Sequence, residues 1–246
     1  MTACERAAFY FSLLLILGET PHCVTAGKVL VWPGEFSHWF HFRVIIEGLI
    51  ERGHNVTVVT YSATPSVNTT PSLGYNVEII QVPHTKQDVT DRMDGFIKYW
   101  TYDMANDNII QASLKIKELI NFMSQQNDVF CRNLFARKDL MEKWNKEEFE
   151  VLLTDPMIFC WELLAQKLNL SFIISLRFSF GSAMERLCGQ LPAPPSYVPG
   201  AAFGYTDEMG FPQRLNNFLF YRFQDFVFRL VTRRWDHLFT EMMGKQ

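Results

Sequence analysis

Two residues in this sequence, His38 and Asp155, have the side chains of a base and its charge partner. His38 ends the stretch Trp32-Pro-Gly-Glu-Phe-Ser-His, which follows a short apolar run. Asp155 ends a second apolar run and is followed by Pro156. An imidazole accepts a proton near neutral pH, and a neighbouring carboxylate fixes its tautomer and stabilises the imidazolium. If the fold brings them together, the pair predicts a general base that acts on a hydroxyl of the substrate.

Both residues also have structural alternatives. His38 has the type and place to cap a helix or to pack against Trp39. An Asp-Pro step is a good helix start, so Asp155 is also expected to be a helix N-cap. Capping and catalysis do not exclude each other at Asp155.

The expected elements would place both residues at one crevice. Apolar runs predict an α/β, Rossmann-like, doubly wound parallel sheet, since strands alternate with helices. In the usual strand order the first and fourth strands are neighbours, at the point where ligands bind. His38 is expected at the loop–helix junction after the first strand, and Asp155 at the end of the fourth. The expected strands are residues 28–32, 55–60, 75–82, 149–154 and 171–176.

Helices are expected between these strands and beyond them. The first helix, residues 40–52, should bury Phe42, Val44, Ile45 and Leu49. A second follows Asp155, and the middle of the chain is helical, with an apolar stripe that predicts core packing. These further helices are residues 159–168, 88–145 and 214–237, and the stripe is Ile109, Ile110, Leu114, Ile116, Leu119, Ile120 and Met123.

The last of these helices is rich in aromatic residues and arginines. It fits two descriptions: a helix at a membrane surface, or a core helix that packs against a further part of the protein. Before it, the proline-rich residues 191–199 predict an extended loop.

The N-terminus has the pattern of a secretory signal peptide, residues 1–26. Ala7 to Leu17 is an apolar core too short to span a bilayer, and Val24-Thr-Ala26 resembles a cleavage site. The alternative is an uncleaved anchor. A secretory route fits the glycosylation sequons at Asn55, Asn68 and Asn169. Asn68 lies in the most loop-like context, whereas Asn55 begins an expected buried strand.

Composition excludes several classes of protein. The formal net charge is −3, which argues against nucleic acid as a partner. Past the signal, Cys131, Cys160 and Cys188 permit at most one disulfide, and the sequence leaves their pairing open. No metal-binding motif and no further membrane-length apolar run occur in the sequence.

Several motifs, in order, resemble the N-terminal half of the vertebrate UDP-glucuronosyltransferases, especially the second subfamily with its olfactory-type enzymes. The motifs are Lys28-Val-Leu-Val-Trp-Pro33, Ser37-His-Trp39, Glu51-Arg-Gly-His-Asn-Val-Thr57, Thr154-Asp-Pro156, Leu176-Arg-Phe-Ser179 and Ala193-Pro-Pro-Ser-Tyr-Val-Pro199.

The resemblance implies a specific reaction. It implies the N-terminal, acceptor-binding domain of a GT-B glycosyltransferase over residues 27–246, with His38 as the general base and Asp155 as its charge partner. The donor is UDP-glucuronic acid, the acceptors are lipophilic alcohols, phenols and acids, and transfer proceeds with inversion and without a metal. Phe36 and Trp39 are expected near the acceptor. The family further implies the lumenal side of the endoplasmic reticulum, membrane association, and oligomers with other glucuronosyltransferases.

The sequence also departs from the family. Phe180 stands where many relatives have proline, and Gly34-Glu-Phe36 falls in a variable part of the loop. Nothing resembles the family's UDP-sugar signature or its C-terminal anchor, so this half is expected to bind no cofactor by itself. Two alternatives to an acceptor half stay open: a catalytically silent short form that modulates full-length relatives, and a secreted domain that only binds a hydrophobic ligand.

Overall fold

The computed structural model describes residues 26–70, 74–176, 184–200 and 203–244. Residues 1–25 of the predicted signal peptide and the segment Arg177 to Phe180 therefore lie outside the described residues. The described elements are β1 (Lys28–Trp32), α2 (Ser37–Glu51), β2 (Asn55–Tyr61), β3 (Asn76–Ile80), α3 (Lys86–Lys98), η2 (Tyr99–Asp103), η3 (Met104–Asn106), α4 (Ile109–Ala136), α5 (Lys138–Glu147), β4 (Val151–Thr154), α6 (Trp161–Lys167), β5 (Ser171–Ile174), η4 (Met184–Cys188) and α7 (Phe211–Met243).

The strands form one parallel sheet in the order β3-β2-β1-β4-β5. This confirms the expected doubly wound topology, including the pairing of β1 with β4. The register places Trp32 opposite Thr154, so the residues that follow these two strands leave the sheet side by side.

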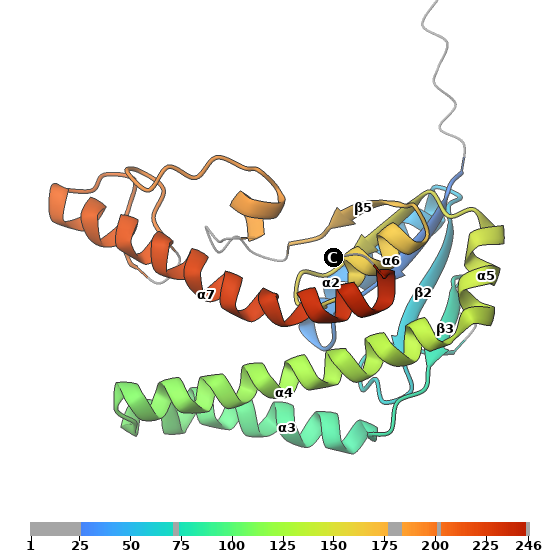
Figure 1. The fold of residues 1–246 in the computed structure, drawn as a ribbon, viewed down its shortest axis with the longest axis horizontal. Helices are drawn as coiled ribbons and strands as arrows, with labels where there is room; N and C mark the ends of the chain where they lie inside the picture. The colour runs from blue at the N-terminus through green and yellow to red at the C-terminus, as the bar shows by residue number, and fades with distance from the viewer. Residues whose placement is uncertain (1–25, 71–73, 177–183, 201–202, 245–246) are drawn as a thin grey trace, which may run out of the picture.

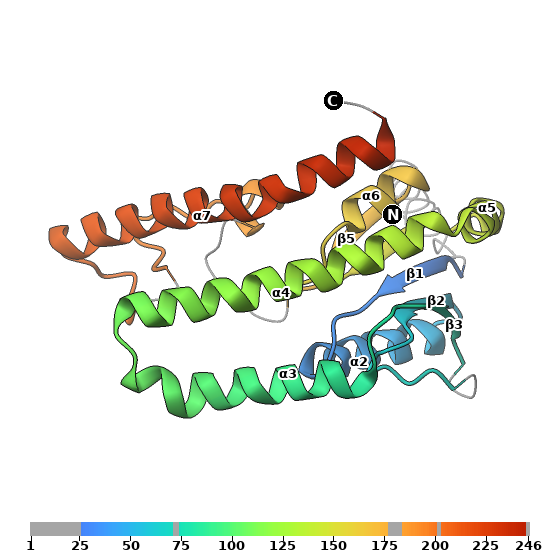
Figure 2. The ribbon, with the colours of Figure 1, turned by 60° about the horizontal axis from the view of Figure 1, so that its bottom comes forward.

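Helices cover both faces of the sheet, and β1 shows why. Val29 and Val31 point into a core cluster under α2, whereas Leu30 and Trp32 point into a second cluster with α4, α5 and α6. Alternating side chains of a strand face opposite sides, so a strand buried on both sides must be apolar throughout. Figure 2 shows the sheet between α2 on one side and α4 on the other.

A disulfide links two helices within the core cluster that contains Leu30 and Trp32. Cys131 on α4 is bonded to Cys160, the residue before α6, and both are buried. This settles the pairing that the sequence left open. The side chain of Cys188 lies outside the described residues.

Two burial predictions were wrong. Val44 on α2 is 64% exposed, because the helix buries Trp39, Phe42 and Ile46 instead. Leu114 on α4 is 56% exposed, since this part of α4 extends beyond the sheet beside α3 (Figure 1). Met123 is partly buried. The other side chains of the predicted stripe lie outside the described residues.

Helix boundaries also differ from the expectation. The central helical region is interrupted at η2 and η3 and again at Arg137. The C-terminal helix α7 is longer than predicted at both ends, because Pro212 fits its first turn and Gly244 ends it with φ 63°.

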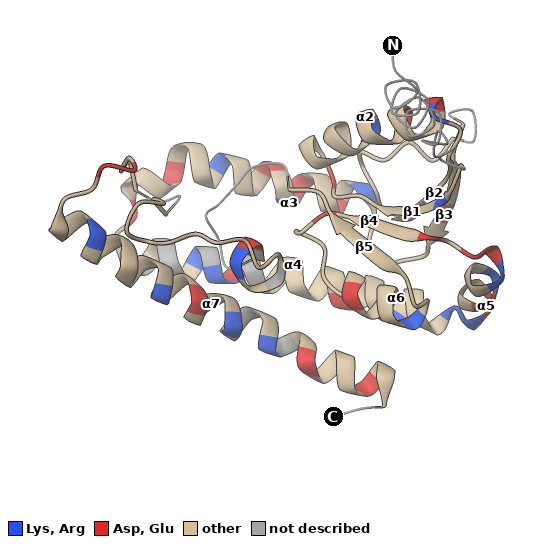
Figure 3. Cartoon of the chain, turned by 90° about the horizontal axis from the view of Figure 1, so that it is seen from above, with Lys and Arg blue, Asp and Glu red and all other residues tan. Residues whose placement is uncertain are grey.

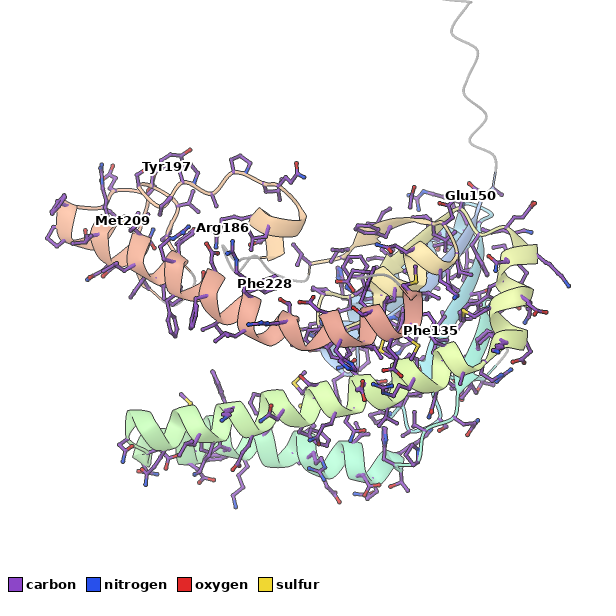
Figure 4. All side chains as sticks on the ribbon, viewed as in Figure 1. Phe135, Glu150, Arg186, Tyr197, Met209 and Phe228 are labelled. Carbon is purple, nitrogen blue, oxygen red and sulfur yellow. A yellow bond between two sulfur atoms is a disulfide. The ribbon has the colours of Figure 1, made fainter. Side chains whose placement is uncertain are left out.

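The proline-rich loop before α7 is not extended throughout, since the N–H groups of Tyr197 and Val198 donate to the Pro194 carbonyl and close a turn. One buried side chain holds this loop. Asn217 on α7 accepts a hydrogen bond from the Gly200 N–H at 2.7 Å and donates to the carbonyls of Pro195 and Val198, each at 2.8 Å. Arg186 of η4, labelled in Figure 4, forms an ion pair with Asp225 of the same helix. The Asn217 hydrogen bonds therefore fix the loop against α7, and the ion pair fixes η4 against the same helix.

A row of large apolar side chains on α7 is exposed: Phe211, Leu215, Phe218, Leu219, Phe223, Phe226 and Leu230. Arginines lie among them, and Figure 3 shows charged residues along the whole helix. Within the described part of the chain, no helix has both the length and the hydrophobicity to cross a membrane.

Candidate active site

The structure brings His38 and Asp155 together at the edge of the sheet where β1 and β4 end. His38 Nδ1 lies 2.7 Å from Asp155 Oδ2, and the side chains are 23% and 1% exposed. The helix α2 begins at Ser37, three residues earlier than predicted, so His38 lies in its first turn and not at a loop–helix junction. The position of the pair agrees with the prediction from strand order.

Asp155 has a second structural task, but it is not the predicted helix cap. Its Oδ1 accepts a hydrogen bond from the Met157 N–H at 2.8 Å, and its carbonyl accepts from Ile158 at 3.2 Å. The helix α6 starts only at Trp161, after Cys160 in a left-handed conformation. Asp155 therefore stabilises a turn directly after β4. This turn keeps the Asp155 carboxylate beside the His38 imidazole.

This geometry has a clear chemical consequence. A buried carboxylate beside Nδ1 favours the tautomer in which Nδ1 carries the proton and donates it to Oδ2. In this tautomer Nε2 carries the lone pair that can accept a proton, and the His38 side chain as a whole is 23% exposed. The pair thus has the arrangement of a base and its orienting group.

Gly34 lets the loop pass close to this pair, which the sequence analysis did not foresee. A Cβ atom at Gly34 would lie 2.9 Å from His38 Cβ and 3.1 Å from Asp155 Oδ2. Both neighbours are short, buried or helix-anchored groups, so neither can move aside without disturbing their contact. The only hint in the sequence was the closeness of Gly34 to His38.

We expect Gly34→Ala to displace the His38–Asp155 pair and to lower kcat by about 10- to 100-fold in an active enzyme, because small misplacements of catalytic groups are costly. Steady-state kinetics measures this. Gly95→Ala is the matched control, since a Cβ there meets nothing within 4 Å. Equal kcat for Gly34→Ala and the parent would contradict the close packing.

The loop between β1 and α2 is also held from the side of β2. The Phe36 N–H donates to Ser66 Oγ at 2.7 Å, and the Ser66 N–H donates to Glu35 Oε2 at 3.3 Å. Phe36 adopts φ 54°, which is rare for a residue other than glycine. Its side chain is half-buried, two positions before His38.

Burial raises the pKa of the Glu35 carboxyl, although hydrogen bonds from Thr64, Ser66 and Tyr61 act in the opposite direction. Desolvation and the nearby Glu35 charge raise the pKa of Tyr61 as well. Glu35 is thus an acidic group inside the fold, close in sequence to the candidate base.

A pH prediction follows from the Glu35 pKa. Since the folded-state pKa is raised, the folded protein keeps a proton that the unfolded chain has lost, and the free energy of unfolding falls as pH rises above about 4.5. We expect Glu35→Gln to remove this contribution, so the stability of the variant relative to the parent should increase from acid to neutral pH. Urea unfolding across that range measures it, and a constant difference would contradict it.

Trp39, the second residue predicted to lie near the acceptor substrate, is buried in the core. Trp39 is 3% exposed and packs edge-on against Tyr75 in the core under α2, with ring centroids 6.4 Å apart. Its contact with an acceptor stays a prediction. One turn after His38, His41 Nε2 lies 2.8 Å from Ser175 Oγ at the end of β5, a contact that the sequence analysis missed.

The structure describes all three asparagines of the predicted glycosylation sequons. Asn55, Asn68 and Asn169 are all exposed, so the burial expected near Asn55 does not extend to its own side chain.

Among the described residues, no group of three or more His, Cys, Asp or Glu side chains could hold a metal ion.

The fold and the site define a parallel α/β domain with a His–Asp pair at the carboxyl edge of its sheet. A model of the family "UDP-glucoronosyl and UDP-glucosyl transferase" matches residues 27–246. The chain belongs to this family, as its sequence motifs indicated.

Individual members of this family are also similar to the chain. The chain is 36% identical to human UDP-glucuronosyltransferase 2A2 over 223 residues, covering 90% of this chain and 42% of the relative. It is 38% identical to mouse UDP-glucuronosyltransferase 2A1 over 224 residues, covering 89% and 42%. For human UDP-glucuronosyltransferase 2B17 the identity is 36% over 222 residues, covering 90% and 42%. These matches confirm the resemblance to the second subfamily, and the chain spans less than half the length of these relatives.

A solved structure is also similar, that of Glycyrrhiza uralensis UGT73P12 complexed with glycyrrhetinic acid 3-O-monoglucuronide. The TM-score is 0.36 at 12% identity, covering 90% of this chain and 48% of that chain. This likeness is too low to carry an argument, so the fold assignment rests on the sheet topology.

Proposed function

We propose that this chain is the acceptor-binding half of a UDP-glucuronosyltransferase with the GT-B architecture. It would conjugate glucuronic acid from UDP-glucuronic acid to a hydroxyl or carboxyl group of a lipophilic acceptor. The observation that carries the proposal is the contact of 2.7 Å between His38 Nδ1 and Asp155 Oδ2 at the carboxyl edge of the sheet. Family membership supports the donor class.

In this reaction His38 Nε2 removes the proton of the acceptor hydroxyl. The acceptor oxygen attacks the anomeric carbon, the bond from that carbon to the UDP oxygen breaks, and its electron pair leaves with UDP. Attack from the opposite side inverts the configuration. Asp155 stabilises the imidazolium, and general-base assistance of this kind contributes about 10²–10⁴ in rate.

The donor sugar is assigned to a C-terminal domain of the kind that the full-length relatives are expected to carry. Phe36 is the proposed apolar contact for the acceptor, because it is half-buried and two residues before His38. Trp39 supports the same helix from the core.

The proposed location is the lumenal side of the endoplasmic reticulum. The pattern of a signal peptide in residues 1–26 and the exposed sequon at Asn68 support it. The exposed apolar row on α7, with Arg222 and Arg229 nearby, supports contact with a membrane surface or with another glucuronosyltransferase.

A second candidate function rests on the same exposed row. It would let the chain associate with full-length glucuronosyltransferases and modulate them without catalysis. Large exposed apolar surfaces commonly mark interaction sites, which is the specific reason to retain this alternative.

The test joins this chain to the C-terminal half of human UDP-glucuronosyltransferase 2A2 and expresses the fusion in microsomes. We expect transfer from UDP-glucuronic acid to some members of a panel of lipophilic phenols, with an inverted, β-linked product by NMR. A folded fusion that transfers to none of them would contradict the proposal. Altered activity of a co-expressed full-length relative, with no transfer by the fusion, would favour the second candidate.

A further inference from the structure

The loop between β1 and α2, which leads to His38, is held by contacts on two sides. On one side Gly34 packs against Asp155, which follows β4. On the other side Glu35 and Phe36 contact Ser66, in the loop that follows β2. This second set of contacts, called the grip below, has no part in the proton transfer described above. It is built almost entirely from polar groups.

The hydrogen bonds of this grip are complementary. Ser66 Oγ accepts from the Phe36 N–H at 2.7 Å, and the Ser66 N–H donates to Glu35 Oε2 at 3.3 Å. Thr64 Oγ1 accepts from the Val67 N–H at 3.0 Å, so the turn that carries Ser66 is itself held by a side chain. Two hydrogen bonds in opposite directions therefore join Ser66 to the loop that leads to His38.

Glu35 also connects this grip to the helix that carries His38. The His38 N–H donates to the Glu35 carbonyl at 3.1 Å, and the Phe40 N–H donates to the Phe36 carbonyl at 3.3 Å. Between them Phe36 is held at φ 54°, a backbone conformation that is unfavourable for a residue other than glycine and persists only when its surroundings enforce it. The hydrogen bond from the Phe36 N–H to Ser66 is the contact that enforces it.

We propose that Glu35 is a positioning residue for His38: its carboxylate, which accepts the Ser66 N–H, fixes the start of α2 together with the hydrogen bond from the Phe36 N–H to Ser66 Oγ, and thereby fixes the contact of His38 Nδ1 with Asp155 Oδ2. Without this grip Phe36 relaxes toward an unstrained conformation and the first turn of α2 shifts. The catalytic value of this role rests on the proposed function, whereas the structural coupling does not.

The test reads the His38 ring directly in the folded chain. Ring ¹⁵N chemical shifts report which nitrogen carries the proton, with His38→Ala used for assignment. The parent should show the Nδ1–H tautomer. We expect Ser66→Ala to give a mixture of tautomers and to speed amide exchange at His38 and Phe40 by about tenfold, because the turn opens more often.

Glu35→Gln is the second variant, and it keeps the size of the side chain. Its amide replaces one carboxylate oxygen with an N–H donor and removes the negative charge, which weakens the acceptor for the Ser66 N–H, so we expect a change in the same direction as in Ser66→Ala. The matched control is Ser62→Ala, because Ser62 Oγ accepts from the Val82 N–H at 3.0 Å, in the same loop but facing β3. This control should leave the His38 tautomer unchanged.

Two results would overturn the proposal. One is an unchanged His38 tautomer and amide exchange in both Ser66→Ala and Glu35→Gln. The other is an equal change in Ser62→Ala, which would indicate general loosening of the loop. In the fusion with a donor half, both grip variants should lower kcat with little change in the KM for UDP-glucuronic acid. If no fusion transfers sugar, the proposed function fails while the ring and exchange measurements still decide this inference.

Discussion

Replacing His38 with alanine is expected to lower kcat by about 10²–10⁴-fold in the fusion of this chain with a donor half. The reason is the loss of the Nε2 lone pair that we propose as the acceptor of the substrate proton, while Asp155 stays buried without its partner. Conjugate formation from UDP-glucuronic acid measures the effect. The KM for the donor should change little, because the donor is assigned to the other half.

His54→Ala is the matched control for this experiment. His54 Nδ1 accepts a hydrogen bond from the Gly27 N–H at 3.0 Å, before the start of β1, and therefore at the opposite edge of the sheet from His38. Its kcat should equal that of the parent. Retention of full activity by His38→Ala would show that another group takes the proton.

Removal of the disulfide has the largest effect expected on stability. The bond between Cys131 and Cys160 spans 29 residues, and closing a loop of that length stabilises a folded chain by about 3–4 kcal/mol in the chain-entropy description. We expect the double variant Cys131→Ala, Cys160→Ala to lose about this much in urea unfolding. Its folded state should still contain the His38–Asp155 pair, because the hydrogen bonds of the Asp155 carboxylate come from His38 and from the Met157 N–H.

Reduction supplies the control. A reducing agent should destabilise the parent by a similar amount and leave the double variant unaffected. If mass spectrometry of the unreduced parent finds Cys131 or Cys160 as a free thiol, or if the double variant is as stable as the parent, the cross-link between α4 and α6 is absent.

The arrangement of the site was predictable from the sequence because it depends on strand order. The apolar runs that became β1 and β4 carry strong signals, and their pairing follows from the usual order of a doubly wound sheet. His38 and Asp155 needed only to follow those strands. The pairing of β1 with β4 was confirmed, and the observed register of Trp32 with Thr154 explains why residues far apart in sequence lie together.

Features that depend on neighbours distant in sequence were not predictable. Nothing local indicates that Gly34 must lack a Cβ, because the atoms in the way belong to His38 and Asp155. The grip of Ser66 on Phe36 likewise joins two loops. Leu114 was assigned to the core because its spacing is helical, but periodicity reports which face of a helix is apolar and not whether anything covers that face.

The central claim is that His38 and Asp155 act as one catalytic unit, and a double-mutant cycle tests it most directly. In the donor-half fusion, kcat is measured for His38→Ala, Asp155→Asn and the double variant. The account predicts that Asp155→Asn alone lowers kcat by about 10²-fold or more, but by less than about twofold once His38 is already alanine, because residues that act as a unit are not additive. Losses that multiply independently in the double variant would contradict the account.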